Sequence, residues 1–378
     1  MKKILLATLV CSISFMVSAQ KKAASNESYL LVGTYTSAKS DGIYVYKFNS
    51  ADGSFTPVSN ASGFKNPSYL AVSPNEKYVF AVNETGGNDP GMVTAFSFDK
   101  KTGSLTKINQ QPSGGDHPCY VAVDKTGKWI ALANYSGGSL EVLPVAADGG
   151  LGTPFLIQHE GKSVTKRQEK PHVHSTVFSP DNKYLFVPDL GQDKIVTYSF
   201  NADNGKTVAA NPAFTATEPG TGPRHFAFSP SGKFGYVITE ITGTVNAYSY
   251  DGKGKLTPLQ SISSHPADFT GTIGSADIHV SPDGKFLYAS NRGSANNIAI
   301  FSIDQATGKL TNVGFQSTLG KTPRNFNFDP SGNFLLVANQ DTDDIVIFKI
   351  DKKTGLLTDT GKKIEVGKPV CVKWASIK

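Results

Sequence analysis

The sequence predicts an all-β fold: a seven-bladed β-propeller of four-stranded antiparallel blades, with the last blade closed by both termini. Three observations predict it: a repeat of about fifty residues, period-two alternation within each repeat, and chain ends that complete one another. The 378 residues are enough for one large β domain. The 37 glycines and 21 prolines are spread along the chain without a collagen-like period, and they indicate many short turns.

The first part of the repeat is a strand, a tight turn and a second strand, and it occurs six times. The copies are PSYLAVSPNEKYVFAVNE from Pro67, PCYVAVDKTGKWIALANY from Pro118, VHSTVFSPDNKYLFVPDL from Val173, PRHFAFSPSGKFGYVITE from Pro223, SADIHVSPDGKFLYASNR from Ser275 and PRNFNFDPSGNFLLVANQ from Pro323. Equivalent turn residues lie 48 to 55 positions apart. A fixed period of this length is typical of propellers and other repeat architectures.

The second part of the repeat is an alternating strand followed by a Thr-Gly turn and Leu-Thr. Clear copies are VTAFSFDKKTGSLT from Val93, IAIFSIDQATGKLT from Ile298 and IVIFKIDKKTGLLT from Ile345. Each repeat therefore holds four short strands, which is the size of a propeller blade.

The two chain ends together supply a seventh copy. PVCVKWAS from Pro369 matches a first strand and then stops. YLLVGTYT from Tyr29 matches a second strand, and GIYVYKFNSADGSFT from Gly42 matches a third with its turn. A blade built from both termini closes the ring and removes a sheet edge that would favour aggregation. The prediction is one domain over residues 28–378.

Residues 1–19 have the pattern of a secretory signal peptide. Lys2 and Lys3 precede an apolar stretch over residues 4–17, and Val17-Ser18-Ala19 gives a small-residue cleavage site. The apolar stretch is shorter than the roughly 20 residues of a membrane span. We expect cleavage, a flexible lead over residues 20–27, and a monomer that is periplasmic or secreted and has no membrane contact after signal cleavage.

Charge and cysteine content restrict the partners. The formal net charge is +6 without a Lys/Arg-rich run, which argues against nucleic acid and suits a pocket for an anionic small molecule. Cys119 and Cys371 fall in repeats that are not neighbours, so two buried free thiols are expected rather than a disulfide.

Equivalent positions of a propeller repeat form rings around the central channel, and charged residues in such a ring are site candidates. At the residue after the opening proline the ring is Ser68, Cys119, His174, Arg224, Ala276, Arg324 and Val370. Two residues upstream it is Asn66, His117, His172, Gly222, Gly274, Thr322 and Lys368. At the end of the second strand it is Tyr35, Glu84, Tyr135, Leu190, Glu240, Arg292 and Gln340. Such charges require mutual pairing or a ligand at one mouth of the channel.

Structural and metal-binding interpretations of these charges remain open at this point. Pairs such as Glu240 with Arg292 can be inter-blade salt bridges. His172 and His174 can hold a metal if Asp277 or His225 supplies a third ligand. The neighbouring arginines repel a cation, so we expect neither a metal nor a cofactor. His279 is expected to be a packed, structural histidine. The sequence lacks G-x-S-x-G, H-E-x-x-H and Walker A motifs, which disfavours a covalent serine mechanism.

The repeat motifs resemble those of the seven-bladed propeller lactonases of the 6-phosphogluconolactonase type, a fold shared by the carboxy-muconate lactonizing enzymes of fungi. The resemblance rests on VGTYT at Val32, PSYLAVSP at Pro67, HPCYVAVDKTG at His117, ANYSGGS at Ala133, PHVHS at Pro171, GTGPRH at Gly220, ADIHVSPDGKFLYASNR at Ala276 and PRNFNFDPSGNFLLVANQ at Pro323. It covers nearly the whole chain after the signal peptide.

The resemblance implies metal-independent hydrolysis of a small anionic or sugar-derived lactone. It points to His174 (or His172), Arg224 and Glu240 as the catalytic group. A histidine can take the proton of the attacking water, an arginine can hold the carbonyl oxygen, and a glutamate can orient either group or act as the base. Expected substrate-binding residues are His172, Arg292, Arg324, Asp277, His117, Glu84 and Tyr135.

Two questions about function follow from the sequence. The phosphogluconate route is cytoplasmic, whereas this chain carries an export signal, which favours an unphosphorylated gluconolactone or another sugar lactone. The alternative is a non-catalytic exported propeller that binds a ligand or a protein partner. A deep polar pocket at the mouth would favour the enzyme, and a large exposed apolar patch would favour the binding protein.

Overall fold

The computed structural model describes residues 26–377. The predicted signal peptide and most of the predicted lead lie outside this range. The first strand begins at Glu27, one residue before the expected start of the domain. Within the described range, no helix has the length and apolar character needed to cross a membrane.

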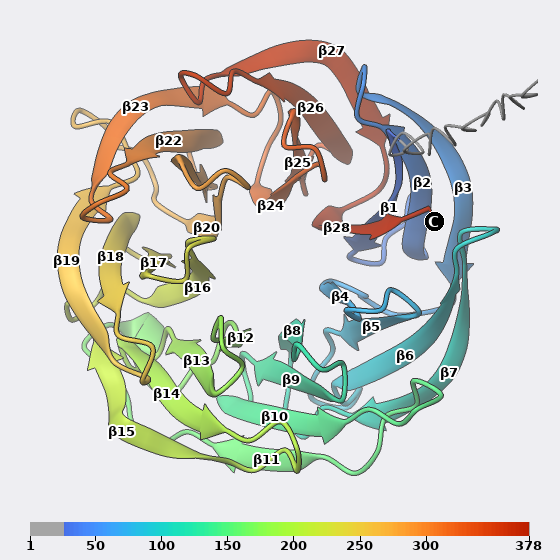
Figure 1. The fold of residues 1–378 in the computed structure, drawn as a ribbon, viewed down its shortest axis with the longest axis horizontal. Coiled ribbons are helices and arrows are strands. Elements are labelled where there is room, and N and C mark those ends of the chain that lie inside the picture. Colours follow the sequence, from blue (N-terminus) through green and yellow to red (C-terminus); the bar gives the residue numbers. More distant parts are fainter. Residues whose placement is uncertain (1–25, 378) are drawn as a thin grey trace, which may run out of the picture.

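The fold is the predicted all-β propeller, with seven sheets of four antiparallel strands arranged in a ring (Figure 1). In strand order, the first three blades are β28 (Pro369–Ser376), β1 (Glu27–Thr34), β2 (Gly42–Asn49), β3 (Ser54–Ser62); β4 (Leu70–Val72), β5 (Tyr78–Asn83), β6 (Met92–Asp99), β7 (Ser104–Pro112); and β8 (Pro118–Val123), β9 (Trp129–Asn134), β10 (Ser139–Pro144), β11 (Phe155–Gln158).

The remaining four blades follow in chain order around the ring. They are β12 (Val177–Phe178), β13 (Tyr184–Asp189), β14 (Lys194–Phe200), β15 (Thr207–Ala216); β16 (Pro223–Phe228), β17 (Phe234–Thr239), β18 (Thr244–Tyr250), β19 (Leu256–Ser263); β20 (Ser275–Val280), β21 (Phe286–Asn291), β22 (Asn297–Ile303), β23 (Leu310–Ser317); and β24 (Pro323–Phe328), β25 (Phe334–Asn339), β26 (Asp344–Ile350), β27 (Leu357–Glu365).

The ring is closed by pairing between the two ends of the chain, as the sequence predicts. β28 pairs antiparallel with β1, with Leu31 opposite Lys373 and Val32 opposite Val372. Leu30, Val32 and Val372 are fully buried and pack against Leu336 and other apolar residues of the preceding blade. The closing blade is therefore bonded across the termini and packed into the ring.

Aromatic side chains fill the gaps between adjacent blades. Phe186 of β13 stacks on Phe226 of the next blade, with ring centroids 5.7 Å apart. Tyr250 packs edge-on against Phe186 and at a tilt against Phe228. The turn glycines adopt left-handed backbone conformations; Gly332, for example, has φ +65° and faces Pro282 of the preceding blade's turn. Buried apolar surface between blades is thus the main source of stability.

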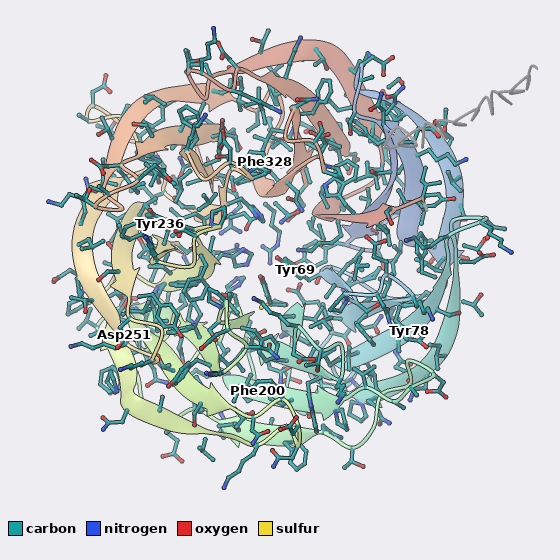
Figure 2. All side chains as sticks on the ribbon, in the orientation of Figure 1. Tyr69, Tyr78, Phe200, Tyr236, Asp251 and Phe328 are labelled. Atoms are coloured by element: carbon teal, nitrogen blue, oxygen red, sulfur yellow. The ribbon has the colours of Figure 1, made fainter. Side chains whose placement is uncertain are left out.

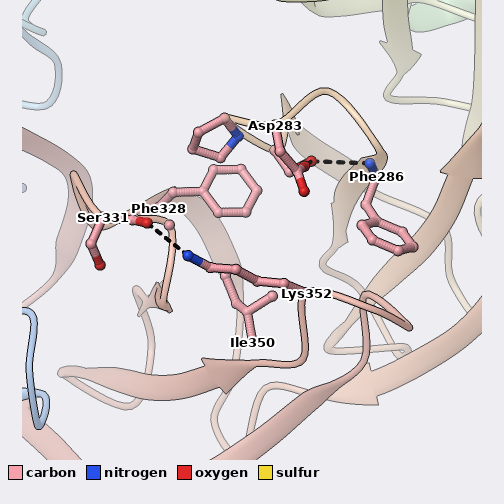
Figure 3. Close-up of a pocket in the computed structure, with 9 residues that line it drawn as sticks. Asp283, Phe286, Phe328, Ser331, Ile350 and Lys352 are labelled. Carbon is pink, nitrogen blue, oxygen red and sulfur yellow. Dashed lines mark hydrogen bonds between the residues drawn. The ribbon is translucent and has the colours of Figure 1, made fainter. Parts of the chain in front are cut away.

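A small gap remains between the blades of β20 and β24. This cavity of about 80 Å³ is lined by Phe286, Phe328 and Ile350, and Lys352 Nζ crosses it to donate to Ser331 O at 3.1 Å (Figure 3). Ile350 ends β26 at the position where β18 ends in Tyr250. Isoleucine is smaller than tyrosine and fills less of the space between the blades. We therefore interpret the cavity as a packing gap and not as a binding site.

Both cysteines of the described chain are buried and free, which confirms the prediction of two thiols.

One buried acid has a carboxyl oxygen without a hydrogen-bond partner. Glu141 on β10 is 1% exposed, and its Oε2 has no hydrogen-bond partner. Burial raises the pKa of Glu141 to about 8.

Leu30→Ala tests the contribution of the closing blade to stability. Leu30 is completely buried, so the truncation should lower the free energy of unfolding by about 2–5 kcal/mol in chemical denaturation. Leu356→Ala, at a side chain with 44% exposure, is the matched control and should change it by less than about 0.5 kcal/mol. Equal losses in the two variants would contradict the packing described here.

Glu141→Gln tests the buried acid through pH. The folded pKa of about 8 exceeds the ordinary 4.5, so the folded state holds this proton more tightly than the unfolded state. Wild-type stability should therefore fall as pH rises from about 4.5 to 8. The stability of Glu141→Gln relative to wild type should rise by at least about 1 kcal/mol between pH 5 and pH 8.5 in urea denaturation. A pH-independent difference would argue against a buried neutral acid.

Candidate active site

The antiparallel register explains why residues far apart in the sequence meet at one mouth of the channel. Pro223 at the start of β16 pairs with Thr239 at the end of β17, and Pro323 at the start of β24 pairs with Asn339 at the end of β25. The residue that follows each position, such as Arg224 or Glu240, therefore lies at the same end of its blade. Repeating this in every blade produces the rings expected from the sequence.

A polar cavity of about 240 Å³ opens at this mouth, and all seven blades contribute to it. Its lining residues are Tyr35, Glu84, Cys119, Tyr135, His174, Glu240, Arg292 and Arg324. Six of the ten predicted site residues are among them. Tyr35 and Cys119 belong to the rings but were not among the predicted site residues.

Glu240 is the centre of the charge network. Its Oε2 lies 2.8 Å from Arg224 Nε and 3.0 Å from Arg292 Nη2, while its Oε1 contacts Arg167 Nη2. Burial alone would raise the pKa of Glu240, but Arg292, Arg224, His174 and Arg167 together hold it well below its usual range. The carboxylate is therefore ionised at neutral pH.

Arg224 lies beside the cavity rather than in its lining. The side chain is 1% exposed, and Nη1 donates to the carbonyl oxygen of Ala276 at 2.6 Å. With Nε donating to Glu240 Oε2, this guanidinium holds the carboxylate without lining the cavity itself. The structure thus gives Arg224 the geometry of a positioning residue, and Arg292 the geometry of a group that faces a ligand.

A second carboxylate and arginine lie elsewhere in the cavity lining. Glu84 Oε2 accepts hydrogen bonds from Tyr35 Oη at 2.8 Å and Ser68 Oγ at 2.5 Å. Arg324 Nη2 lies 3.9 Å from Glu84 Oε1, and its guanidinium lies over the Tyr35 ring.

Arg292, the arginine beside Glu240, also stays charged at neutral pH. Burial lowers its pKa to about 10, although the charge of Glu240 acts to raise it.

His174 is the histidine that faces Glu240. Its Nε2 lies 4.0 Å from Glu240 Oε2, and its Nδ1 lies 3.7 Å from Cys119 Sγ. Burial, Arg224 and His225 together hold the pKa of His174 well below its usual range. His174 is therefore neutral at neutral pH, with a lone pair able to accept a proton.

His172 takes a different position from His174. Its ring stacks on Tyr135 at 4.5 Å, and its Nδ1 lies 3.0 Å from the carbonyl oxygen of Tyr135. It lines an adjoining open depression of about 440 Å³ with Tyr135, Lys166, Arg167, Glu169 and Lys170. Only His174 of the two predicted alternatives faces the carboxylate of Glu240.

Besides Arg224 and His172, two more predicted site residues, Asp277 and His117, lie outside the cavity lining. Asp277 lies in a second layer, where it binds His225 Nδ1 at 2.7 Å and His279 Nε2 at 3.0 Å. Tyr69, which points to the centre of the ring in Figure 2, packs edge-on against His225. His117 is exposed at the rim, with φ +53°. The pairing of His279 with Asp277 agrees with the structural role expected for it.

The metal alternative receives no geometric support from these residues. His172 and His174 both contact the Tyr135 ring, while Asp277 and His225 bind each other in the second layer. Over residues 26–377, no three His, Cys, Asp or Glu side chains are grouped closely enough to hold a metal ion.

Arg167 is a site residue that the repeat analysis missed. It lies in the long connection over residues 159–176, within the short 3₁₀ helix η1 (Lys166–Gln168). Its side chain is 49% exposed and its Nη2 contacts Glu240 Oε1. Because Arg167 precedes His172, the first ring position of this segment, it has no equivalent in the other repeats, and ring comparison cannot find it. The available signal was the length of the segment and its cluster of four basic residues, Lys162, Lys166, Arg167 and Lys170.

Arg224→Met and Arg167→Met compare a buried and a half-exposed partner of the same carboxylate. Loss of the buried cation should reduce the free energy of unfolding by about 3–5 kcal/mol, because Glu240 keeps its burial and loses a charge partner. Loss of the half-exposed cation should cost less than about 1 kcal/mol. Urea denaturation at pH 7 measures both, and similar losses would contradict this ranking.

Comparison with known proteins agrees with this architecture. The family described as "Lactonase, 7-bladed beta-propeller" matches residues 29–374. The chain is 39% identical over 345 residues to a 6-phosphogluconolactonase of Bacillus subtilis, covering 91% of this chain and 97% of that protein. It is 41% identical over 317 residues to a 6-phosphogluconolactonase of Formosa agariphila, covering 82% and 89% of the two chains.

A solved structure shows the same fold. The periplasmic gluconolactonase of Pseudomonas aeruginosa superposes with a TM-score of 0.89 at 41% identity, covering 93% of this chain and 100% of that one. The fold, the closure of the ring and the sequence similarity therefore point to the same family. The chain belongs to the seven-bladed β-propeller lactonases and is a lactone hydrolase of the 6-phosphogluconolactonase-like type.

Proposed function

We propose that this protein hydrolyses the lactone of a sugar acid to the free acid in the cavity at the channel mouth. One observation carries the proposal: a neutral histidine, two carboxylates and two arginines face the same cavity of about 240 Å³. A propeller lactonase needs a proton acceptor for water and a cationic partner for the developing oxyanion, and this cavity contains both.

His174 is the proposed general base. A water between His174 Nε2 and the lactone carbonyl carbon gives its proton to the imidazole as its oxygen attacks that carbon. The carbonyl oxygen becomes negative in the tetrahedral intermediate. The ring carbon–oxygen bond then breaks, and the imidazolium returns the proton to the leaving alkoxide, so the proton count balances.

Arg292 is the proposed partner of the negative oxygen. It lines the cavity, carries a full charge at neutral pH, and is held by Glu240 Oε2 at 3.0 Å. A planar guanidinium with several N–H donors can bind an oxyanion and a carboxylate at the same time. Arg224, assigned by resemblance to the catalytic group, is proposed to act through Glu240 instead.

Glu240 is proposed to hold the arginines and to stabilise the transient imidazolium. With several cations around it, this carboxylate is a weak base, which leaves the proton transfer to His174. Glu84, Arg324 and Tyr135 offer acceptors and donors for the hydroxyl groups of a sugar lactone. His172 is proposed to bind substrate at the edge of the adjoining depression.

The proposed substrate is an unphosphorylated sugar lactone met outside the cytoplasm. The predicted signal peptide supports export, and the Pseudomonas aeruginosa neighbour is described as a periplasmic gluconolactonase. The relatives named 6-phosphogluconolactonase support a phosphorylated lactone as the competing substrate.

A pH-stat assay with purified protein tests the proposal. Glucono-δ-lactone and its 6-phosphate are supplied separately with EDTA, and acid release is compared with the spontaneous rate. Wild type should accelerate release from the unphosphorylated lactone, while His174→Gln and Arg292→Met should each reduce kcat/KM by at least about a hundredfold.

Folding controls and a surface variant make this assay decisive. Circular dichroism must show intact β structure in each variant, and Lys77→Gln on the exposed surface should retain wild-type rates. Wild-type rates in folded His174→Gln would remove His174 from the chemistry. No acceleration of any sugar lactone by folded wild type would favour a binding propeller.

A further inference from the structure

Cys119 has an unusual set of contacts at the cavity wall. It is the second residue of β8, is 5% exposed, and lies in the lining of the cavity. Its Sγ is 3.7 Å from His174 Nδ1, 3.6 Å from the carbonyl oxygen of His174 and 3.8 Å from that of Val173. The single thiol proton thus has three possible acceptors. Which of them it bonds affects the protonation of the His174 ring nitrogens.

The carbonyl of His174 is missing one ordinary strand partner. His174 N donates to the carbonyl oxygen of Pro188 at 3.1 Å. In an antiparallel pair the opposite residue normally returns a hydrogen bond, but Pro188 has no N–H to donate. A buried backbone carbonyl without a donor is costly, and the thiol of Cys119 contacts this oxygen.

The position of the thiol proton decides the tautomer of His174. Burial raises the pKa of the Cys119 thiol, so it keeps its single proton at neutral pH. If that proton points to the carbonyl oxygen of His174, the sulfur can only accept from the imidazole. His174 Nδ1 must then carry the hydrogen, and Nε2 faces Glu240 with its lone pair free.

We propose that Cys119 is a positioning residue that, because Pro188 leaves the His174 carbonyl unpaired, fixes His174 in the Nδ1–H tautomer and so keeps Nε2 free to accept a proton. This inference rests on the proposed function, since it explains how His174 is prepared as a base. In the opposite arrangement the thiol donates to Nδ1 and the Nε2–H tautomer results. That tautomer cannot take a proton from water through Nε2.

The kinetic test compares the two free cysteines of the described chain. Cys119→Ala removes the contact with Nδ1, and we expect kcat to fall at least about tenfold with KM within about twofold of wild type. Cys371→Ala is the matched control: this thiol is also buried on an innermost strand but contacts Leu70 N, and its rates should stay at the wild-type level.

Cys119→Ser provides a rescue variant. Its hydroxyl can donate to the carbonyl oxygen and accept from Nδ1, so its kcat should exceed that of Cys119→Ala. Wild-type kcat in folded Cys119→Ala would overturn the proposal. An equally reduced kcat in Cys119→Ala and Cys119→Ser would also overturn it. The proposal requires a group that can form these hydrogen bonds, which serine has and alanine lacks, whereas a purely steric role of the sulfur would not make the serine variant faster.

A second measurement needs no substrate. In protein with ¹⁵N-labelled histidine, the nitrogen shifts distinguish a protonated from an unprotonated ring nitrogen, and a His174→Gln sample assigns the resonances. We expect Nδ1–H in wild type and a mixture of tautomers in Cys119→Ala. A dominant Nε2–H tautomer in wild type would overturn the proposal. Absence of lactonase activity would instead overturn the proposed function, so the two failures can be told apart.

Discussion

The carboxylate of Glu240 is the constraint on which the site depends. It is buried and paired with Arg224, Arg292 and Arg167, and each of these cations lies on a different blade or connection. A buried charge is tolerated only with partners, so the carboxylate and the arginines hold one another in place. Burial, together with Arg224 and His225, holds the pKa of the neighbouring His174 well below its usual range, so this imidazole is neutral. The cavity therefore combines paired arginines and carboxylates with an uncharged histidine, which are the groups that the proposed hydrolysis uses.

The propeller makes this arrangement possible because its rings bring distant residues together on rigid strands. Starts of innermost strands and ends of second strands meet at one mouth, and the pairing of β28 with β1 fixes the last blade to the first. Tyr35 of the closing blade and Arg324 of the blade before it contact each other across this junction. Closure of the ring is thus also a requirement for the site, since without β28 the strand β1, which Tyr35 directly follows, would lose its inner neighbour.

Much of the fold and part of the site can be predicted from sequence because the repeat has a fixed period. The six hairpin copies and the split seventh copy determine the blades, and ring comparison places Glu84, His174, Glu240 and Arg292 at one mouth. It fails where the structure departs from the repeat. Arg167 lies in an inserted connection, Asp277 lies in the second layer and pairs with His225, and His117 is exposed at the rim. The contact of Cys119 with His174 depends on Pro188, whose effect appears only when the strands are paired.

The central claim is that neutral His174 activates the water, and the pH dependence of kcat/KM on glucono-δ-lactone tests it most directly. The neutral imidazole is the active form, and its surroundings hold its pKa well below the ordinary 6.5. Activity should therefore persist as pH falls through 6.5, and should decline only at lower pH in a limb that His174→Gln abolishes along with most of the rate. A limb centred at or above pH 6.5, or one that survives in folded His174→Gln with near wild-type rates, would contradict this account.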